Sequence, residues 1–256
     1  MWEKTDISKE LNDPAPCCRG CLGGDLSLIG HKDGFDLLRC ADCKTVIAGP
    51  LPSEEELARY YYSHGKTSDY LRKRDAKIRR GLHRVKKILR ARPPGRKFLD
   101  IGCNIGFTVE AAHQLGLEAY GIDIDTDAIE QARLHYPAAG RFEAVPVEDY
   151  ATRGDTFDMI YMSEVVEHVR DPDTFIAAVA KLLRPGGVLY ITAPDGAHFA
   201  VPRDFASWGM VCPPQHLTFF SRTGMKKLLA RHGLDIRSFS IAFKPGIKAL
   251  ARKTEA

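Results

Sequence analysis

The chain has 256 residues, which is enough to bury a large hydrophobic core in one or two domains. Its apolar and charged fractions, 44% and 27%, are ordinary for a globular protein, and no apolar run is long enough to cross a bilayer. The net charge is only +4, with basic residues concentrated between 72 and 97, so charge alone does not predict a nucleic-acid partner. The first residues lack the basic-then-apolar pattern of a secretory signal, and we therefore expect a cytoplasmic protein.

Residues 1–16 are polar and predict a flexible arm, and residues 17–49 form a cysteine-rich module. Two C-x-x-C pairs stand eighteen residues apart in this module, namely Cys18, Cys21, Cys40 and Cys43. Two pairs at this spacing supply four thiolates to the tetrahedral zinc of a ribbon. Four sulfur ligands leave no open coordination position, so we expect structural zinc. Cys17 could replace Cys18 through a register shift.

Residues 50–94 predict a helical cap or linker. Ser53 and Glu56 form a capping-box pattern that predicts a helix to about residue 61, and helical periodicity predicts a second helix over 69–91. Charge runs on such a basic helix usually mark a solvated face. Four tyrosines flank a glycine-containing stretch between the two helices and could form a lid or simply pack, namely Tyr60, Tyr61, Tyr62 and Tyr70.

From residue 95 to 256, strand and helix patterns alternate. The expected strands are 97–101, 117–123, 141–145, 157–162, 187–193, 234–243 and 247–253, and the expected helices are 105–115, 126–135, 172–184 and 222–232. This alternation predicts an α/β fold with a doubly wound, mostly parallel, seven-stranded sheet. A tight Lys-Pro-Gly turn at 244–246 joins the last two strands, so we expect one antiparallel strand at the end of the sheet.

Two of these strands end in acids beside a glycine turn. Asp100 ends the first strand, Gly102 and Gly106 belong to the turn that follows, and Asp123 ends the second strand. Acids at neighbouring strand ends beside such a turn can hold an adenosine-bearing cofactor, with Asp123 accepting from the ribose hydroxyls. Glycines would let the backbone approach the cofactor closely. The alternative is that each acid only caps a helix.

Four motifs together resemble the class I S-adenosylmethionine-dependent methyltransferases. They are Leu-Asp-Ile-Gly-Cys-Asn-Ile-Gly at 99–106, Tyr-Gly-Ile-Asp-Ile-Asp at 120–125, Ser-Glu-Val-Val-Glu-His at 163–168 and the Leu-Arg-Pro-Gly-Gly segment at 183–194. The resemblance covers roughly residues 50–253 and is closest to the ubiquinone-type O-methyltransferases and the zinc-bearing sugar C-methyltransferases. It implies a Rossmann-like methyltransferase domain, with S-adenosylmethionine as its cofactor.

The resemblance also implies where that cofactor binds. Asp100 would accept from its ammonium, Ile124 would lie against the adenine, Glu148 or Asp149 would lie near the adenine amino group, and Ser163 would lie beside the sulfonium. Many relatives have Gly where Asn104 stands, but Asn tolerates the left-handed backbone. The expected cofactor-binding residues are Asp100, Gly102, Asn104, Gly106, Phe107, Asp123, Ile124, Val147, Glu148 and Ser163.

Methyl transfer to a hydroxyl or a carbon acid requires removal of a proton, and His216 is the first candidate base. It lies in a segment from 195 to 220 that is too long for a plain connection and fits an active-site cover. The alternative is a histidine that anchors the following helix.

Glu164, Glu167 and His168 are the second candidates for catalysis. A helical turn would place Glu164 and His168 on one face, and in ubiquinone-type relatives these acids and histidine can bind a divalent ion. The alternative is a cap and ion-pair cluster.

The sequence therefore predicts methyl transfer from S-adenosylmethionine to an oxygen or carbon of a small or carrier-linked metabolite, without a membrane span. An RNA methyltransferase would use the zinc ribbon and the basic helix, but an Asn-Pro-Pro-Tyr-type motif is missing after the fourth expected strand, where Ser163 stands. A third hypothesis is an inactive zinc-ribbon interaction protein, which Asn104 alone supports.

Overall fold

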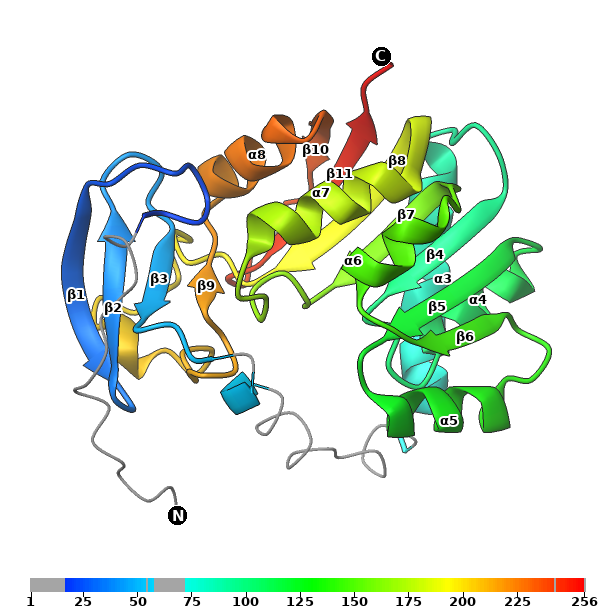
Figure 1. Cartoon of the computed structure of the whole chain (residues 1–256), viewed down its shortest axis with the longest axis horizontal. Helices are drawn as coiled ribbons and strands as arrows, with labels where there is room; N and C mark the ends of the chain where they lie inside the picture. Colours follow the sequence, from blue (N-terminus) through cyan, green and yellow to red (C-terminus); the bar gives the residue numbers. More distant parts are fainter. Residues whose placement is uncertain (1–16, 54, 58–71, 242, 256) are drawn as a thin grey trace.

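The computed structural model describes residues 17–53, 55–57, 72–241 and 243–255. The predicted arm, most of the first predicted helix and the four tyrosines lie outside these residues. The start of that helix is described and carries the expected capping box, because Ser53 N donates to Glu56 Oε2 at 2.7 Å and Glu56 N donates to Ser53 Oγ at 3.2 Å. The described strands form one four-stranded and one seven-stranded sheet (Figure 1).

The seven-stranded sheet is the centre of the fold. Its strands are β4 (Lys97–Ile101), β5 (Glu118–Asp123), β6 (Arg141–Ala144), β7 (Phe157–Ser163), β8 (Leu183–Ala193), β10 (Leu234–Phe239) and β11 (Ile247–Lys253). They lie in the order β10-β11-β8-β7-β4-β5-β6, and only β11 runs antiparallel to its neighbours. The predicted mostly parallel sheet is confirmed. The reversed strand lies one place in from the edge, because β10 forms the edge itself.

Helices cover both faces of this sheet (Figure 1). One face carries α3 (Arg74–Arg90), α4 (Phe107–Gln114) and α5 (Thr126–His135), and the other carries α6 (Val147–Tyr150), α7 (Pro172–Leu182) and α8 (Arg222–Arg231). The structure also describes two short 3-10 helices, η1 (Ala151–Arg153) and η2 (Phe205–Ser207). Two buried apolar clusters, one on each face, hold the layers together. Among the helices described here, none has the length and apolarity needed to span a membrane.

Helix α7 is shorter than its periodicity predicts. Asp171 caps its start by accepting from Asp173 N and Thr174 N, but the helix ends at Leu182 and not at residue 184. Strand β8 begins directly at Leu183. Pro185 explains the early end, because proline has no backbone N–H and pushes the residue before it toward extended backbone.

The cysteine module forms the second sheet together with a strand from far along the chain. Its strands are β1 (Leu26–Lys32), β2 (Phe35–Cys40) and β3 (Val46–Gly49), and β9 (Thr218–Phe219) pairs antiparallel with β3. Figure 1 shows β9 beside β3 at the edge that faces the larger sheet. The segment between β8 and α8 therefore completes the N-terminal module, which its sequence did not indicate.

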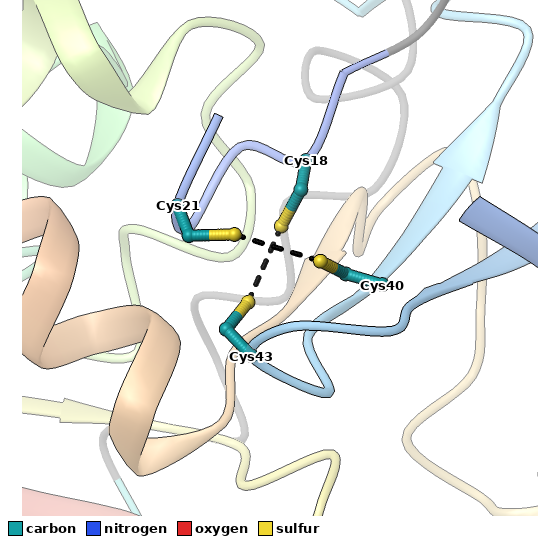
Figure 2. Close-up of side chains that lie close together, drawn as sticks. All are labelled: Cys18, Cys21, Cys40 and Cys43. Carbon is teal, nitrogen blue, oxygen red and sulfur yellow. Dashed lines mark hydrogen bonds between the residues drawn. The ribbon is translucent and has the colours of Figure 1, made fainter. Parts of the chain in front are cut away.

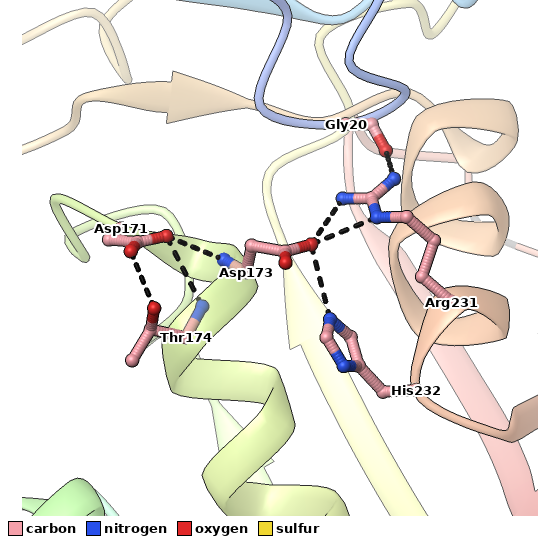
Figure 3. Close-up of polar contacts among 6 residues, drawn as sticks. All are labelled: Gly20, Asp171, Asp173, Thr174, Arg231 and His232. Atoms are coloured by element: carbon pink, nitrogen blue, oxygen red, sulfur yellow. Dashed lines mark hydrogen bonds and ion pairs between the residues drawn. The ribbon is translucent and has the colours of Figure 1, made fainter.

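Polar and apolar contacts attach this module to the larger domain. In Figure 3, Arg231 near the end of α8 donates to the carbonyl of Gly20 at 2.8 Å and to Asp173 Oδ1 at 2.7 Å. A buried apolar cluster also joins the two parts, with Leu37, Val46, Ala48, Phe205, Trp208, Val211 and Phe219 as members. The module thus shares its core with residues 205–219.

Candidate cofactor, zinc and catalytic sites

The order in which the strands are added across the sheet reverses at β4. From β4 the chain continues to β5 and β6 on one side, and then returns to β7 and β8 on the other. In open sheets of this kind, ligands bind outside the carboxyl ends of the strands at the reversal point. The structure brings Asp100, Asp123 and Ser163 to this edge, because β4, β5 and β7 are parallel neighbours.

Asp123 organises the glycine turn. Its Oδ2 accepts from Asn104 N at 2.8 Å, and its Oδ1 accepts from Asp125 N at 3.0 Å. An ionised carboxylate has about four acceptor positions, more than these contacts with its own loop use. The structural role is therefore compatible with binding ribose hydroxyls.

Asp100 is buried, with an exposed fraction of 2%. Burial, and next the neighbouring charge of Asp123, raise the pKa of Asp100 well above its ordinary value. Burial also raises the pKa of Asp123. A buried and a half-buried carboxylate side by side are costly to ionise together, and a cation between or beside them lowers this cost. The arrangement fits a ligand that carries positive charge.

The two glycines are required by the protein itself. Gly102 has a φ of +73° and Gly106 has a φ of +83°, both in the left-handed region. An added Cβ would lie 2.5 Å from Val165 Cγ2 at Gly102, and 2.7 Å from the ring of Phe142 at Gly106. This steric reason differs from the expected approach to the cofactor. Asn104 adopts a φ of +49°, the left-handed backbone that its side chain was expected to tolerate.

The other predicted cofactor residues differ in accessibility. Ile124 follows β5 and is 56% exposed, which is high for a large apolar side chain. Glu148 on α6 is half-buried. Val147 and Phe107 belong to the buried core, and the ring of Phe107 meets that of Tyr136 edge to face. Ile124 and Glu148 can therefore offer side chains to a ligand, whereas Val147 and Phe107 support the surrounding backbone.

A hydrogen-bond network links the ends of β7 and β8 to α3. Arg84 on α3 donates to Ser163 Oγ at 3.0 Å, and Ser163 Oγ lies 2.7 Å from Thr192 Oγ1. Thr192 in turn donates to Glu164 Oε1 at 2.7 Å. Sequence reasoning did not identify Arg84 or Thr192, because their roles depend on contacts between distant elements.

The helical turn expected after β7 does not form. Glu164 has a φ of +56°, and His168 N donates to the carbonyl of Val165 at 2.9 Å in a non-helical turn. Glu164 and His168 therefore do not share a helix face. Glu164 is exposed, whereas Glu167 is fully buried.

The turn instead brings Glu167 and His168 together with His216. Nδ1 of His168 lies 2.8 Å from the carbonyl oxygen of Gln215, and Nδ1 of His216 lies 2.6 Å from that of Met210. A carbonyl oxygen only accepts, so both Nδ1 atoms carry protons and both Nε2 atoms keep lone pairs in the neutral rings. Burial lowers the pKa of His216; burial, followed by the proximity of His216, lowers that of His168 to about 4.

Within the described part of the chain, the carboxylate of Glu167 has no hydrogen-bond partner. Its exposed fraction is 0%, neither carboxylate oxygen is hydrogen-bonded, and His168 Nε2 lies 3.8 Å from Oε1. One candidate ligand atom from each of Glu167, His168 and His216 lies within 4.8 Å of the other two. A buried carboxylate and two neutral imidazoles whose other nitrogens donate to carbonyls fit a divalent cation.

The segment from 195 to 220 is partly built into the core of the protein. Phe205 and Trp208 are buried in the core shared with the N-terminal module, and His216 is only 7% exposed. Phe199, in contrast, is 84% exposed. The hydrogen bond of His216 to Met210 gives this histidine an anchoring role in the loop, whatever its chemistry.

Four cysteine sulfurs converge in the N-terminal module (Figure 2). Sγ of Cys18 lies 3.4 Å from that of Cys43, and Sγ of Cys21 lies 3.5 Å from that of Cys40. A tetrahedral zinc with bonds of about 2.3 Å separates its sulfur ligands by about 3.8 Å, so the geometry fits this metal. A hydrogen bond from the Cys18 thiol lowers the pKa of Cys43 to about 4.

Cys18 belongs to this group of four sulfurs, whereas Cys17 is exposed and lies outside it.

Comparison with known proteins identifies the larger domain. The family model described as a methyltransferase domain matches residues 70–238. The ubiquinone biosynthesis O-methyltransferase of Mesorhizobium japonicum is 35% identical over 163 residues, which are 53% of this chain and 65% of that protein. The corresponding enzyme of Thiobacillus denitrificans is 39% identical over 107 residues, 40% of this chain and 46% of the relative. The chain thus spans less than two thirds of these relatives.

Solved structures show the same fold. A putative S-adenosylmethionine-dependent methyltransferase from Listeria monocytogenes superposes with a TM-score of 0.55 at 19% identity, covering 68% of this chain and 98% of the other. Magnesium protoporphyrin IX methyltransferase from Synechocystis, solved with bound SAH, gives 0.55 at 17% identity, covering 78% and 94%. Together with the family match over most of the larger domain, the fold and its motifs show that this chain belongs to the class I S-adenosylmethionine-dependent methyltransferases.

Proposed function

We propose that this methyltransferase transfers the methyl group of S-adenosylmethionine to an oxygen or carbon of a small or carrier-linked metabolite. The observation that carries the proposal is the pair of neighbouring carboxylates, buried Asp100 and half-buried Asp123, at the carboxyl edge of adjacent parallel strands. The resemblance to ubiquinone biosynthesis O-methyltransferases supports an oxygen acceptor on a small molecule.

Within this proposal, Asp123 binds the ribose hydroxyls and Asp100 neutralises the ammonium of the cofactor. Ile124 covers the adenine, which would explain why a large apolar side chain stands exposed there. Glu148 lies at the adenine edge. Ser163, fixed by Arg84 and Thr192, borders the site of methyl transfer.

Four thiolates from Cys18, Cys21, Cys40 and Cys43 would hold a structural zinc. Bonds to this metal would supply folding free energy that so small a sheet lacks on its own. A thiolate site of this kind requires reduced cysteines, which supports a cytoplasmic location.

The catalytic centre is proposed to combine Glu164 with the cluster of Glu167, His168 and His216. A divalent cation in this cluster would supply positive charge that lowers the pKa of an acceptor hydroxyl. Glu167 and the Nε2 atoms of the two histidines would bind it. Glu164 is exposed at the end of β7, oriented by Thr192, and can receive the acceptor's proton.

The proposed methyl transfer is a single displacement at the methyl carbon. The acceptor proton passes to Glu164, the acceptor electron pair forms the new bond to the methyl carbon, and the carbon–sulfur bond breaks with its electrons on sulfur. S-Adenosylhomocysteine leaves as a neutral thioether. In-line alignment of the acceptor with that bond is the main contribution required of the protein.

Nucleic acid is not favoured as the acceptor. Several cations of the basic helix α3 contact the protein's own fold: Arg84 donates to Ser163, Lys87 to Ser240 Oγ, and Lys77 lies over the ring of Phe107. These side chains are not part of a free phosphate-binding surface.

Calorimetry with S-adenosylmethionine and S-adenosylhomocysteine tests the cofactor assignment, and a metabolite-pool screen with labelled methyl donor tests the reaction. We expect micromolar cofactor binding and label in a low-molecular-mass product. Absence of cofactor binding to the zinc-loaded protein would refute the proposal, and label confined to RNA would reject the acceptor class.

A further inference from the structure

Residues 215–219, here called the strip, include His216 and end in β9, the strand of the smaller sheet that lies nearest the larger domain. The strip is bonded on both sides. On the side of the larger domain, the amides of Leu217 and Thr218 donate to the carbonyl of Glu167 at 2.8 and 3.2 Å. His168 Nδ1 contacts the carbonyl of Gln215 from the same side. The strip is thus fastened to the turn that carries two members of the proposed catalytic cluster.

On its other side, the strip is bonded to the zinc-ribbon module. Ala48 N donates to the carbonyl of Leu217 at 2.9 Å, and Val46 and Ile47 of β3 pair with Phe219 and Thr218 of β9. The amides of Leu217 and Thr218 therefore face the larger domain at Glu167, while the carbonyl of Leu217 faces the module.

Arg19 closes this second side. Its Nη1 donates to the carbonyl of Leu217 at 2.8 Å and to Thr218 Oγ1 at 3.0 Å, and its Nη2 donates to the carbonyl of Ala48 at 3.2 Å. One planar guanidinium thus joins both strands, β3 and the strip, in a way that the single ammonium of a lysine cannot reproduce.

Arg19 also lies between Cys18 and Cys21 in the sequence, so the four-thiolate cluster determines the position of its backbone. His216 directly precedes Leu217 on the strip, and its Nδ1 is held by the carbonyl of Met210. The side chain of Arg19 therefore links the cysteine knuckle to Leu217, the residue that follows His216 in the chain.

The geometry points to Arg19 as a positioning residue for methyl transfer, through which the zinc-ribbon module fixes His216 against Glu167 and His168. The module thereby acts on the acceptor side of the active site and leaves the cofactor side alone. This inference rests on the proposed role of His216, but not on the identity of the acceptor.

Arg19→Ala tests the inference, with Arg231→Ala as the matched control. Both arginines make hydrogen bonds that join the module to later parts of the chain: Arg19 of the module donates to Leu217, and Arg231 of α8 donates to Gly20 in the module. Of these two arginines, only Arg19 bonds to the strip. We expect Arg19→Ala to lower turnover between about 10-fold and about 100-fold, because small misplacements of catalytic groups have costs of that size. S-Adenosylmethionine affinity and zinc content should match those of the wild type.

A readout independent of activity is the tautomer of His216, followed by nitrogen NMR of histidine-labelled protein and assigned with His216→Gln. Wild-type protein should show the Nδ1–H tautomer, and Arg19→Ala should show a mixture. Arg19→Lys should resemble Arg19→Ala, which separates loss of the planar fork from loss of charge. Circular dichroism verifies that each variant is folded.

An unchanged His216 signal in folded Arg19→Ala, or an equal change in Arg231→Ala, would overturn the inference. Neither result depends on methyl transfer. If wild-type protein bound no S-adenosylmethionine, the proposed function would fail while the NMR comparison still reported on the coupling.

Discussion

The imidazole rings of His168 and His216 meet edge to face, with their centroids 4.7 Å apart and their planes at 68°. One ring follows β7 and the other precedes β9, so two segments that are distant in sequence each contribute a neutral imidazole. Glu167 adds a buried carboxylate beside them. These residue types and tautomers fit a divalent cation.

We expect the wild-type protein to bind one divalent cation per chain in addition to zinc. Glu167→Gln removes the anionic ligand, and should weaken this binding at least about 100-fold, because ligand loss should cost no less than loss of an outer-shell partner. Mn²⁺ titration followed by electron paramagnetic resonance measures the affinity. Glu164→Gln is the control and should retain the ion, since Glu164 is not part of the cluster. Wild-type protein that leaves Mn²⁺ free would contradict the assignment.

His216→Ala should separate chemistry from cofactor binding. His216 lies on the loop after β8 and has no described contact with Asp100 or Asp123, so the S-adenosylmethionine Kd should stay within about twofold. Turnover should fall between about 10²-fold and about 10⁴-fold, the range for loss of a proton-transfer group or its support. Initial rates and calorimetry on the same preparation provide both numbers. Normal turnover would remove His216 from the mechanism.

Asp123→Ala should abolish measurable S-adenosylmethionine binding and leave the fold intact. The variant leaves the amides of Asn104 and Asp125 without their acceptor, so we expect a stability loss of about 1–3 kcal/mol as well. Calorimetry measures binding and thermal unfolding measures stability. Asp127→Ala, on the exposed first turn of α5, is the matched control. Unchanged affinity in Asp123→Ala would refute the ribose role.

The affinity for S-adenosylmethionine should rise with pH. Burial raises the pKa of both Asp100 and Asp123 in the free protein, and the cationic cofactor binds the ionised carboxylates best. Binding therefore releases protons, and affinity falls as pH decreases through the raised pKa values. We expect weaker binding at about pH 5 than at about pH 7. Calorimetry in buffers of different ionisation enthalpy counts the released protons; a count of zero at every pH would contradict the coupling.

Metal analysis should find one zinc bound by the four-cysteine cluster. Cys40→Ser combined with Cys43→Ser should remove it and destabilise the ribbon, because the metal contributes folding free energy there. Cys17→Ser should keep full zinc content, since Cys17 is exposed and lies outside the cluster. Zinc loss in Cys17→Ser would instead show that this cysteine is the ligand. Inductively coupled plasma mass spectrometry and thermal unfolding provide the measurements.

Local patterns were sufficient to predict much of this molecule. Alternating apolar segments indicated the parallel sheet, and the acids Asp100 and Asp123 could be located because strand ends of parallel neighbours meet at one edge. The spacing of the C-x-x-C pairs indicated the sulfur cluster. In each case the chemistry depends on residues that are close in sequence or on one regular rule of topology.

Contacts between distant segments could not be predicted in this way. Strand β9 has two residues, too few for any periodicity, and its partner Ile47 lies in another part of the chain. Arg84 and Thr192 meet Ser163 only after three elements have packed. The left-handed backbone of Glu164 broke the expected helical turn, although the sequence offered no glycine there to signal it.

The pairing of β3 with β9 also has a consequence for biosynthesis. Val46 and Ile47 are synthesised long before Thr218 and Phe219. The edge of β3 in the N-terminal sheet therefore stays unpaired until most of the polypeptide has been made. A nascent chain arrested before that point exposes backbone donors and acceptors that invite aggregation. For the same reason, a fragment of residues 17–49 would not contain the complete ribbon sheet, because it would lack β9, one of the four strands.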